Sequence, residues 1–249
     1  MKISVITVCY NSQSTIQKAI DSVAWQTWPS IEHIVVDGAS RDDTVSIIQA
    51  NAQKIAHFVS EPDTGVYEAM NKGLQLATGD VIAFLNSDDV YHDAKALETV
   101  ALAMKDEGLD ALYGDVEFFN ADNPAVTVRI YDSGQFCPAR LARGWMPAHP
   151  ALFVRREIYR RFGYFREDYR IAGDFEFVAR IFKDGQLKSR HLSKVFVRMQ
   201  TGGLSTAGLR ATYLLNQEIL RACRQNGITS NWLMVLSKYF FKVREFFHV

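Results

Sequence analysis

The 249-residue sequence has few cysteines and no apolar run long enough to cross a membrane. Its three cysteines, Cys9, Cys137 and Cys223, are widely spaced and form no CxxC or Cys/His cluster, which argues against a zinc site or a disulfide framework. A spanning helix needs about 18 or more uncharged apolar residues. The apolar stretch after Met1 is also too short for a signal peptide. We therefore expect a cytoplasmic protein.

Three widespread sequence motifs are also absent. No GxGxxG follows the first apolar run, no GxxxxGK[ST] occurs, and there is no GxSxG. These absences argue against a standard dinucleotide-binding domain, a P-loop enzyme and an α/β-hydrolase, respectively. A ligand that carries phosphate must therefore be held without a glycine-rich cradle.

Charge is balanced over the whole chain but not between its halves. The sequence has 28 basic and 28 acidic residues, and 48% of its residues are apolar, as in a globular protein with a full core. Residues 1–139 contain 8 basic and 20 acidic side chains, and residues 140–249 contain 20 and 8. Such asymmetry indicates a charged partner. A partner that binds the basic second half would be anionic.

Strand and helix patterns alternate four times in about the first 105 residues. This order predicts an α/β fold with a mostly parallel sheet covered by helices on both faces. The expected strands are 3–9, 31–36, 55–59 and 81–85, and the helices between and after them end near residues 25, 53, 77 and 105.

The second half has a different pattern. Residues 111–119 and 126–131 are expected to form an antiparallel pair, and two helices, near 209–226 and 231–248, end the chain. We expect a domain over 1–206, made of a first half (1–110) and a second half (111–206), followed by a helical region over 207–249.

Acidic and amide side chains collect where the first four strands end. They are Asn11, Asp37, Asp63 and the run from Asn86 to Asp89. Ligands of parallel α/β sheets bind beyond the carboxyl ends of the strands. Carboxylates alone would repel phosphate, whereas a divalent cation held by one or two of them would bridge to it.

Seven motifs in register resemble the family 2 glycosyltransferases, which have the GT-A nucleotide-sugar-binding fold. The resemblance covers roughly residues 1–206. The motifs are ISVITVCYN (3–11), VVDGAS (35–40), EPDTGVYEAMNKG (61–73), GDVIAFLNSDD (79–89), MPAHPALFVRREIY (146–159), IAGDFEF (171–177) and GGLS (202–205).

The resemblance implies that residues 1–110 form a nucleotide-sugar half and residues 111–206 an acceptor half. Asp37, beside Gly38, would accept a hydrogen bond from a uracil ring. Lys72 would supply a positive charge, although a solvated helix lysine is an equal alternative. The other implied donor-binding residues are Thr7, Val8, Tyr10, Asn11, Asp63, Gly65, Asn86 and Ser87.

The resemblance also implies a metal site and a general base. Asp88, with help from Asp89, would bind Mn²⁺ or Mg²⁺, and Asn86 departs from the family's Asp-x-Asp pattern. Asp174 would remove the proton of the acceptor hydroxyl. The family usually has Glu-Asp where this chain has Gly173-Asp174, so Asp174 is the one candidate at that helix start.

Further candidates contact the acceptor or the diphosphate in this interpretation. They are Trp145, His149, Arg198, Gly202 and Gly203, with the glycines in a lid. The last helix has apolar residues such as Leu233 on one face and Lys238 on the other, which suits a membrane interface or a second subunit. We expect the protein to be cytoplasmic or peripheral on the inner face of the cell membrane.

These patterns predict an inverting, metal-dependent transferase. It would move a sugar from a nucleotide-diphosphate sugar, most simply UDP-linked, to a glycan or a saccharide on polyprenyl diphosphate. The sequence leaves the formation of a homo-oligomer undecided. Nucleic acid is not an expected partner because the site is acidic. Two alternatives remain: a sugar nucleotidyltransferase, and a catalytically silent nucleotide-sugar-binding or scaffold protein.

Overall fold

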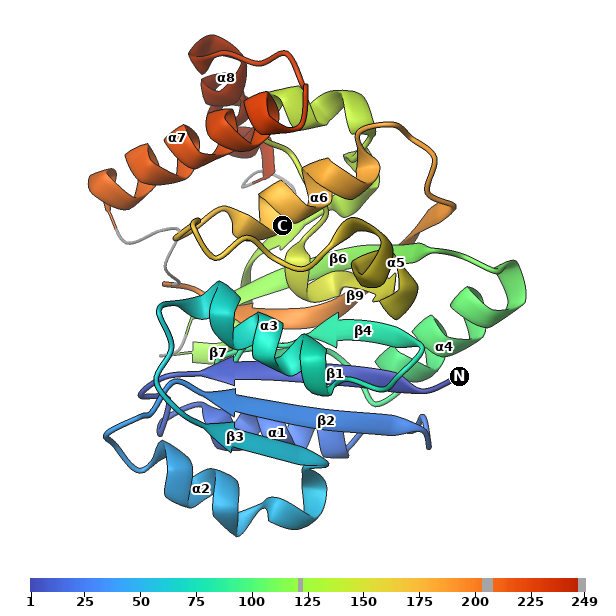
Figure 1. The fold of residues 1–249 in the computed structure, drawn as a ribbon, viewed down its shortest axis with the longest axis vertical. Helices are drawn as coiled ribbons and strands as arrows, with labels where there is room; N and C mark the ends of the chain where they lie inside the picture. The colour runs from blue at the N-terminus through green and yellow to red at the C-terminus, as the bar shows by residue number, and fades with distance from the viewer. Residues whose placement is uncertain (121–122, 203–207, 246–249) are drawn as a thin grey trace.

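The protein is described by a computed structural model that covers residues 1–120, 123–202 and 208–245. A mixed sheet of nine strands, with the order β3-β2-β1-β4-β8-β6-β9-β5 and β7 beside β6, runs through the molecule (Figure 1). Helices cover both faces of this sheet. The predicted α/β fold with a mostly parallel first half is confirmed.

Four parallel strands form the first half of the sheet. Their order, β3-β2-β1-β4, places all four carboxyl ends at one edge. Their side chains are mostly buried because helices lie on both faces. The strands are β1 (Ile3–Cys9), β2 (Ile31–Asp37), β3 (His57–Ser60) and β4 (Val81–Phe84).

The second half of the sheet is mixed. Strand β8 runs antiparallel to β4 and β6, whereas β9 runs parallel to β6 and antiparallel to β5. The expected antiparallel pair forms between β6 and β7. These strands are β5 (Val90–Tyr91), β6 (Ala111–Asn120), β7 (Asn123–Tyr131), β8 (Leu152–Arg155) and β9 (Ser189–Gln200).

The helices divide between the two faces. On one face lie α1 (Ile16–Ala24), α2 (Thr44–Ala50) and α4 (Ala96–Glu107). On the other lie α3 (Val66–Leu76), α5 (Arg156–Phe162) and α6 (Gly173–Phe182). Short 3-10 helices complete the chain at η1 (Ala52–Lys54), η2 (Ser133–Gln135), η3 (Pro138–Arg143) and η4 (His149–Ala151).

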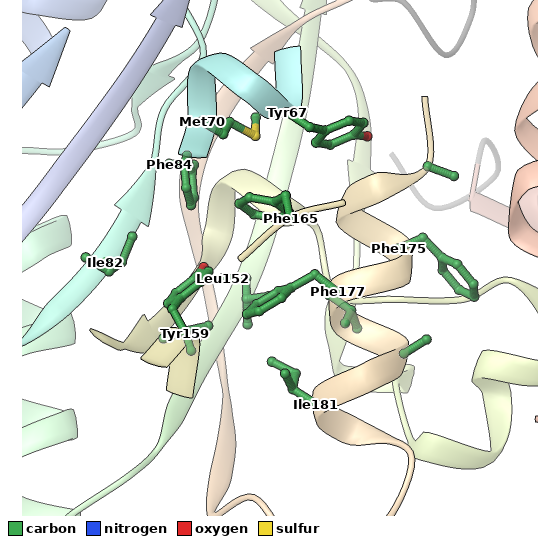
Figure 2. Close-up of a cluster of buried hydrophobic side chains, with 14 of the residues drawn as sticks. Tyr67, Met70, Ile82, Phe84, Leu152, Tyr159, Phe165, Phe175, Phe177 and Ile181 are labelled. Atoms are coloured by element: carbon green, nitrogen blue, oxygen red, sulfur yellow. The ribbon is translucent and has the colours of Figure 1, made fainter. Parts of the chain in front are cut away.

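An aromatic core fixes α3, α5 and α6 against the sheet (Figure 2). The rings of Tyr159 and Phe177 stack with centroids 4.5 Å apart and planes 7° from parallel. Phe165 packs between the rings of Phe84 and Phe177, at 5.3 and 5.1 Å. Large buried aromatics of this kind dominate the energetics of a core. The core therefore holds the first turn of α6 in a defined position relative to β4.

Two helices, α7 (Leu209–Gln225) and α8 (Trp232–Glu245), follow the sheet and lie beyond α6 (Figure 1). Ile219 and Cys223 of α7 and Val235 of α8 belong to the same buried cluster as α6. The helical region is therefore packed on the rest of the protein through a shared core.

Helix α8 buries one residue that its periodicity assigns to the polar face. Lys238, on that face, is 4% exposed, and Val235, on the apolar face, is buried. Leu233, also on the apolar face, is 82% exposed. Within the described residues, no helix is long and apolar enough to cross a membrane.

Candidate active site

The carboxylate of Asp37 ends β2 and is completely buried. It accepts hydrogen bonds from the backbone amide of Ser40 (2.9 Å), from the Ser60 hydroxyl (2.7 Å) and from the Ser40 hydroxyl. Fixed donors of this kind orient a charged carboxylate. Asp37 is thus held rigidly at the carboxyl edge of the sheet, where the sequence places the base of the donor.

Gly38 lets a second carboxylate approach Asp37. A Cβ atom at Gly38 would lie 2.6 Å from Oδ2 of Asp63 and 3.4 Å from the ring of Tyr10. Burial raises the pKa of Asp63, and the Tyr10 side chain is 59% exposed. Tyr10, Gly38 and Asp63 therefore meet at the carboxyl edge of the sheet, beside the buried Asp37.

The other candidates from the end of β1 are engaged within the protein. Thr7 is fully buried, and its hydroxyl lies 3.0 Å from Nε2 of His33. Val8 is buried in the core below the site. Asn11 has a left-handed backbone (φ 50°), and its side-chain oxygen accepts from the Arg41 amide at 2.9 Å. Asn11 thus joins the loops that follow β1 and β2.

Lys72 braces the loop between β3 and α3. Its ammonium lies 3.0 Å from a carboxylate oxygen of Glu61 and 3.1 Å from one of Glu68, and it donates to the Pro62 carbonyl at 2.9 Å. Gly65, with φ 154°, begins the helix in a conformation that favours glycine. The ammonium of Lys72 is thus already paired with two carboxylates.

The turn after β4 presents two carboxyl groups with different surroundings. Asp89 is 1% exposed, accepts from Nδ2 of Asn86 at 2.9 Å and accepts from the amide of Gln200. Burial and the neighbouring Asp88 raise the pKa of Asp89 well above its usual value. Asp89 is therefore directed into the protein, and Asn86 serves it as a hydrogen-bond donor.

Asp88 is the better placed of the two for a cation. It is only half buried, and burial raises the pKa of its carboxyl group. In the described part of the chain Asp88 has no ion pair, so a bound cation would stabilise its charged form. Beside it, Ser87 and Ser12 bring their hydroxyl oxygens to 2.9 Å, which ties this turn to the loop after β1. This donor set fits a divalent ion that keeps phosphate and water ligands.

A separate cluster that the sequence did not indicate lies at β6 and β9. Asp115, Asp132 and His191 bring potential ligand atoms within 4.8 Å of one another. Oδ1 of Asp115 already accepts from the Ser133 amide at 2.9 Å and lies 2.8 Å from Nε2 of His191. No local spacing could have revealed the cluster, because 76 residues separate Asp115 from His191.

Asp174 lies in the first turn of α6, half buried. The Tyr67 hydroxyl, from α3, is 3.3 Å from Oδ1 of Asp174 and donates to the Ile171 carbonyl at 2.7 Å. Burial, followed by the charge of Asp174, raises the pKa of Tyr67 well above its usual value, so the phenol keeps its proton. Tyr67 therefore links the candidate base to the helix that starts beside Asp63.

Glycine at position 173 makes this link possible. A Cβ atom there would lie 2.8 Å from ring carbons of Tyr67, closer than side chains allow. The resemblance implies a glutamate before Asp174, and in this chain the Tyr67 ring occupies the space beside position 173.

We expect Gly173→Ala to lower the free energy of unfolding by about 1–2 kcal/mol. Overpacking typically costs about 1–3 kcal/mol, and the gain in helix propensity returns up to about 1 kcal/mol. Urea unfolding measures the change. In a double-mutant cycle with Tyr67→Leu, the cost should shrink; an undiminished cost would show that the ring is not the obstacle.

Glu218, on α7, holds the chain just before Asp174, and its role was missed from the sequence. Its buried carboxylate accepts three backbone hydrogen bonds, from Arg170 (2.8 Å), Ile171 (2.9 Å) and Ala172 (2.8 Å). The amides at the start of α6 thus find their acceptor in another helix. A helix from the C-terminal region thereby fixes the start of the helix that carries the candidate base.

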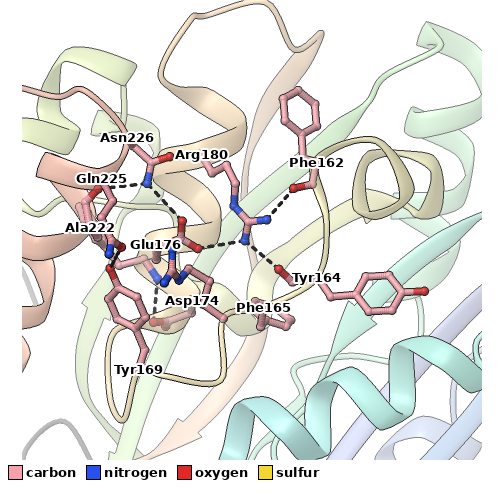
Figure 3. Close-up of polar contacts among 12 residues, drawn as sticks. Phe162, Tyr164, Phe165, Tyr169, Asp174, Glu176, Arg180, Ala222, Gln225 and Asn226 are labelled. Carbon is pink, nitrogen blue, oxygen red and sulfur yellow. Dashed lines mark hydrogen bonds and ion pairs between the residues drawn. The ribbon is translucent and has the colours of Figure 1, made fainter.

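Glu176 faces away from Asp174, as expected for a residue two positions further along a helix (Figure 3). It pairs with Arg180 at 2.9 Å and accepts from Asn226 of the C-terminal region at 3.2 Å. Arg180 in turn donates to the carbonyls of Phe162 and Tyr164, at 2.6 and 2.8 Å. This network anchors α6 and leaves Asp174 as the carboxylate beside Tyr67.

The remaining candidates lie at different depths. His149 stacks on Phe84 (centroids 5.2 Å apart), and burial lowers the pKa of its imidazole. Trp145, 7% exposed, lines a pocket together with Asp174. Arg198 pairs with Glu117. Gly202 has a left-handed backbone (φ 110°), and Gly203 lies outside the described residues.

Comparisons with known proteins identify the family of this chain. The family model "Glycosyl transferase family 2" matches residues 4–163. A PGL/p-HBAD biosynthesis glycosyltransferase from Mycobacterium tuberculosis is 32% identical over 207 residues, which are 81% of this chain and 78% of that protein. An uncharacterised glycosyltransferase from the same species is 32% identical over 72% of this chain and 68% of its own length.

Solved structures share the fold at lower identity. The crystal structure of residues 1–349 of Staphylococcus aureus TarS with UDP-GlcNAc has a TM-score of 0.70 and 21% identity over 91% of this chain. The chain spans 65% of that structure. A mannosyltransferase from Pyrobaculum calidifontis, in complex with GDP-Man and Mn²⁺, has a TM-score of 0.65 and 20% identity over 90% of this chain and 63% of its own. The fold is GT-A, and the chain belongs to glycosyl transferase family 2.

Proposed function

We propose that the protein transfers a sugar from a nucleotide-diphosphate sugar, UDP-linked, to an acceptor hydroxyl, with inversion at the anomeric carbon. The observation that carries the proposal is the contact between Tyr67 and Asp174, at 3.3 Å. It fixes a half-buried carboxylate beside the helix that begins next to Asp63. The relatives named for glycosyl transfer, and the TarS structure that holds UDP-GlcNAc, support the same reaction.

Asp174 accepts the proton of the acceptor hydroxyl in this reaction. The acceptor oxygen then forms a bond to the anomeric carbon while the bond from that carbon to the diphosphate breaks, and the nucleotide leaves with the electron pair. The hydrogen bond from Tyr67 orients the carboxylate, and Asp37 and Asp63 bind the nucleoside end of the donor. Asp88 would hold a divalent cation, which when bound offsets negative charge on the leaving diphosphate.

The proposed donor can be tested directly. We expect UDP-sugars to raise the melting temperature more than GDP-sugars do, and to release UDP when an acceptor is present. Thermal shift with a panel of nucleotide sugars, followed by nucleotide release, measures both. Binding of UDP without turnover of any donor would instead favour a silent binding protein, and production of a nucleotide sugar from a sugar phosphate would favour a nucleotidyltransferase.

Asp88→Asn should reduce transfer by about 10²- to 10³-fold, the usual loss when one group that stabilises developing charge is removed. The variant should also lose the response of the rate to added Mn²⁺ after treatment with EDTA. Asp106→Asn, an exposed change on α4, is the matched control. A rate that EDTA leaves untouched in the parent protein would contradict the role of Asp88.

The proposed acceptor is a saccharide on a polyprenyl diphosphate, handled at the cytoplasmic membrane surface. The excess of basic residues after residue 140 supports an anionic acceptor. Exposed Trp232 and Leu233 at the start of α8 support contact with lipid. Sedimentation with vesicles that contain anionic lipid should show binding, which the double change Trp232→Ser and Leu233→Ser should weaken.

A further inference from the structure

A pocket of about 180 Å³ opens beside Asp174, between α6 and the two C-terminal helices. Asp174 is part of its wall, so a ring seated in the pocket can present a hydroxyl to the carboxylate. Most of the remaining wall is apolar: Trp145, Met146, Ile171, Phe175, Leu215 and Ile219. The chemistry of the pocket is therefore the carboxylate of Asp174 and the ammonium of Lys238 in a mostly aromatic and aliphatic lining.

The indole of Trp145 is fixed in place as one wall. The Trp145 ring stacks on Tyr131, with centroids 6.3 Å apart and planes 27° from parallel. The guanidinium of Arg140, which belongs to η3, lies 5.4 Å from the centroid of the Trp145 ring. The Tyr131 hydroxyl donates to the Met146 carbonyl at 2.7 Å, which ties the segment after Trp145 to β7. A rigid aromatic wall of this kind binds the apolar face of a ring.

Helices α7 and α8 close the other side. Leu215 and Ile219 come from α7, and Lys238 comes from α8. Gly144 lets these helices approach, because a Cβ atom there would lie 3.2 Å from Ile219 and 3.4 Å from Nζ of Lys238. The segment after residue 207 thus contributes to the wall that faces the candidate base.

The volume sets the size of the occupant. A cavity of about 150 Å³ lined by Leu, Ile and Phe is large enough for benzene. A pocket of about 180 Å³ therefore takes one six-membered ring with small substituents. A polar hydroxymethyl group directed at the part of the wall that Leu215 and Ile219 form would lose its hydrogen bonds to water, which apolar side chains do not replace.

We propose that this pocket makes the enzyme selective for an acceptor whose ring presents an apolar face. Such a ring is a 6-deoxyhexose residue or a phenol, with its hydroxyl at Asp174, and Leu215 is a specificity-determining residue. The inference rests on the proposed function. The transferred proton goes to Asp174, the acceptor oxygen bonds to the anomeric carbon, and the nucleoside diphosphate departs with the electron pair.

The test compares three acceptors with the same alkyl chain: a 6-deoxyhexoside, the matched hexoside and a phenol. The full-length protein should use the 6-deoxyhexoside or the phenol at least tenfold better than the hexoside in kcat/KM, because a single extra group in an apolar pocket is worth about 10- to 200-fold. Whichever of the 6-deoxyhexoside and the phenol accepts the transferred sugar identifies the ring in the pocket as a sugar or an aromatic ring.

Substitution at position 215 tests the wall itself. Leu215→Ala should lower the ratio of kcat/KM for the 6-deoxyhexoside to kcat/KM for the hexoside at least tenfold. Leu215→Trp should reduce transfer to every acceptor. Leu233→Ala and Leu233→Trp are matched controls, because Leu233 is 82% exposed on α8. Thermal shift with UDP shows that each variant is folded.

The outcomes separate this inference from the proposed function. If the parent protein transfers sugar but uses hexoside and deoxyhexoside equally, or if Leu215→Ala leaves their ratio unchanged, the inference is overturned and the proposed function stands. If the parent protein transfers sugar to none of the acceptors and releases no UDP from any donor, both fail.

Discussion

Asp174→Asn should lower kcat by about 10²- to 10⁴-fold, the contribution expected of a positioned general base. Asparagine has the same shape and can still accept from the Phe175 amide and from Tyr67, which now bond to Oδ1 at 2.8 and 3.3 Å. We therefore expect the melting temperature and the affinity for the donor nucleotide to stay close to those of the parent. Steady-state kinetics and calorimetric titration with UDP measure the two effects separately.

The control for this change is Asp184→Asn, an exposed substitution just after α6. It removes the same charge at the opposite end of α6, away from the site. If Asp174→Asn kept more than a tenth of the parent rate, Asp174 would not be the base. His149 would then be the next group to test, since burial lowers its pKa and favours the neutral imidazole.

Glu218→Ala should destabilise the protein and misplace Asp174 at the same time. The change removes the acceptor of three backbone amides in a position that is 5% exposed. Hydrogen bonds to charged groups contribute about 1.5–3 kcal/mol each, and unpaired buried amides add to the loss. We expect a loss of about 3 kcal/mol or more, or a melting temperature lower by roughly 6–12 °C for a chain of this size.

The same variant should reduce kcat more than it raises KM for the donor. A displacement of about 1 Å at a catalytic group can cost about 10²-fold, whereas the donor-binding strand ends lie on other elements. Glu218→Gln, which keeps one acceptor oxygen, should restore part of both losses. Gln217→Ala is the control on the exposed side of α7. Equal kcat in Glu218→Ala and the parent, measured where both are folded, would refute a positioning role.

The sequence predicted the parallel half of the fold because its first 105 residues or so repeat a local rule. Apolar runs such as Ile3–Cys9, followed by amphipathic helices, indicate parallel strands wherever they occur. Polar residues after those strands, such as Asp37 and Asp88, must share one edge of the sheet by geometry alone. Neither inference needs knowledge of how distant segments pack.

Features that depend on distant packing escaped the sequence. Glu218 precedes no motif, and its partners at residues 170–172 are more than 45 positions away. The helical periodicity of α8 placed Lys238 on the polar face, whereas contact with η3 and α7 buries it. Likewise, periodicity gives no sign that Tyr67 occupies the space beside Gly173.

The anomeric configuration of the product tests the central claim most directly. With Asp174 acting as a base on the acceptor hydroxyl, the acceptor oxygen displaces the nucleotide in one step. Proton NMR of the product formed from a UDP-sugar of known configuration should then show the opposite configuration at the anomeric carbon. A product with the configuration of the donor would contradict a single displacement and the role assigned to Asp174.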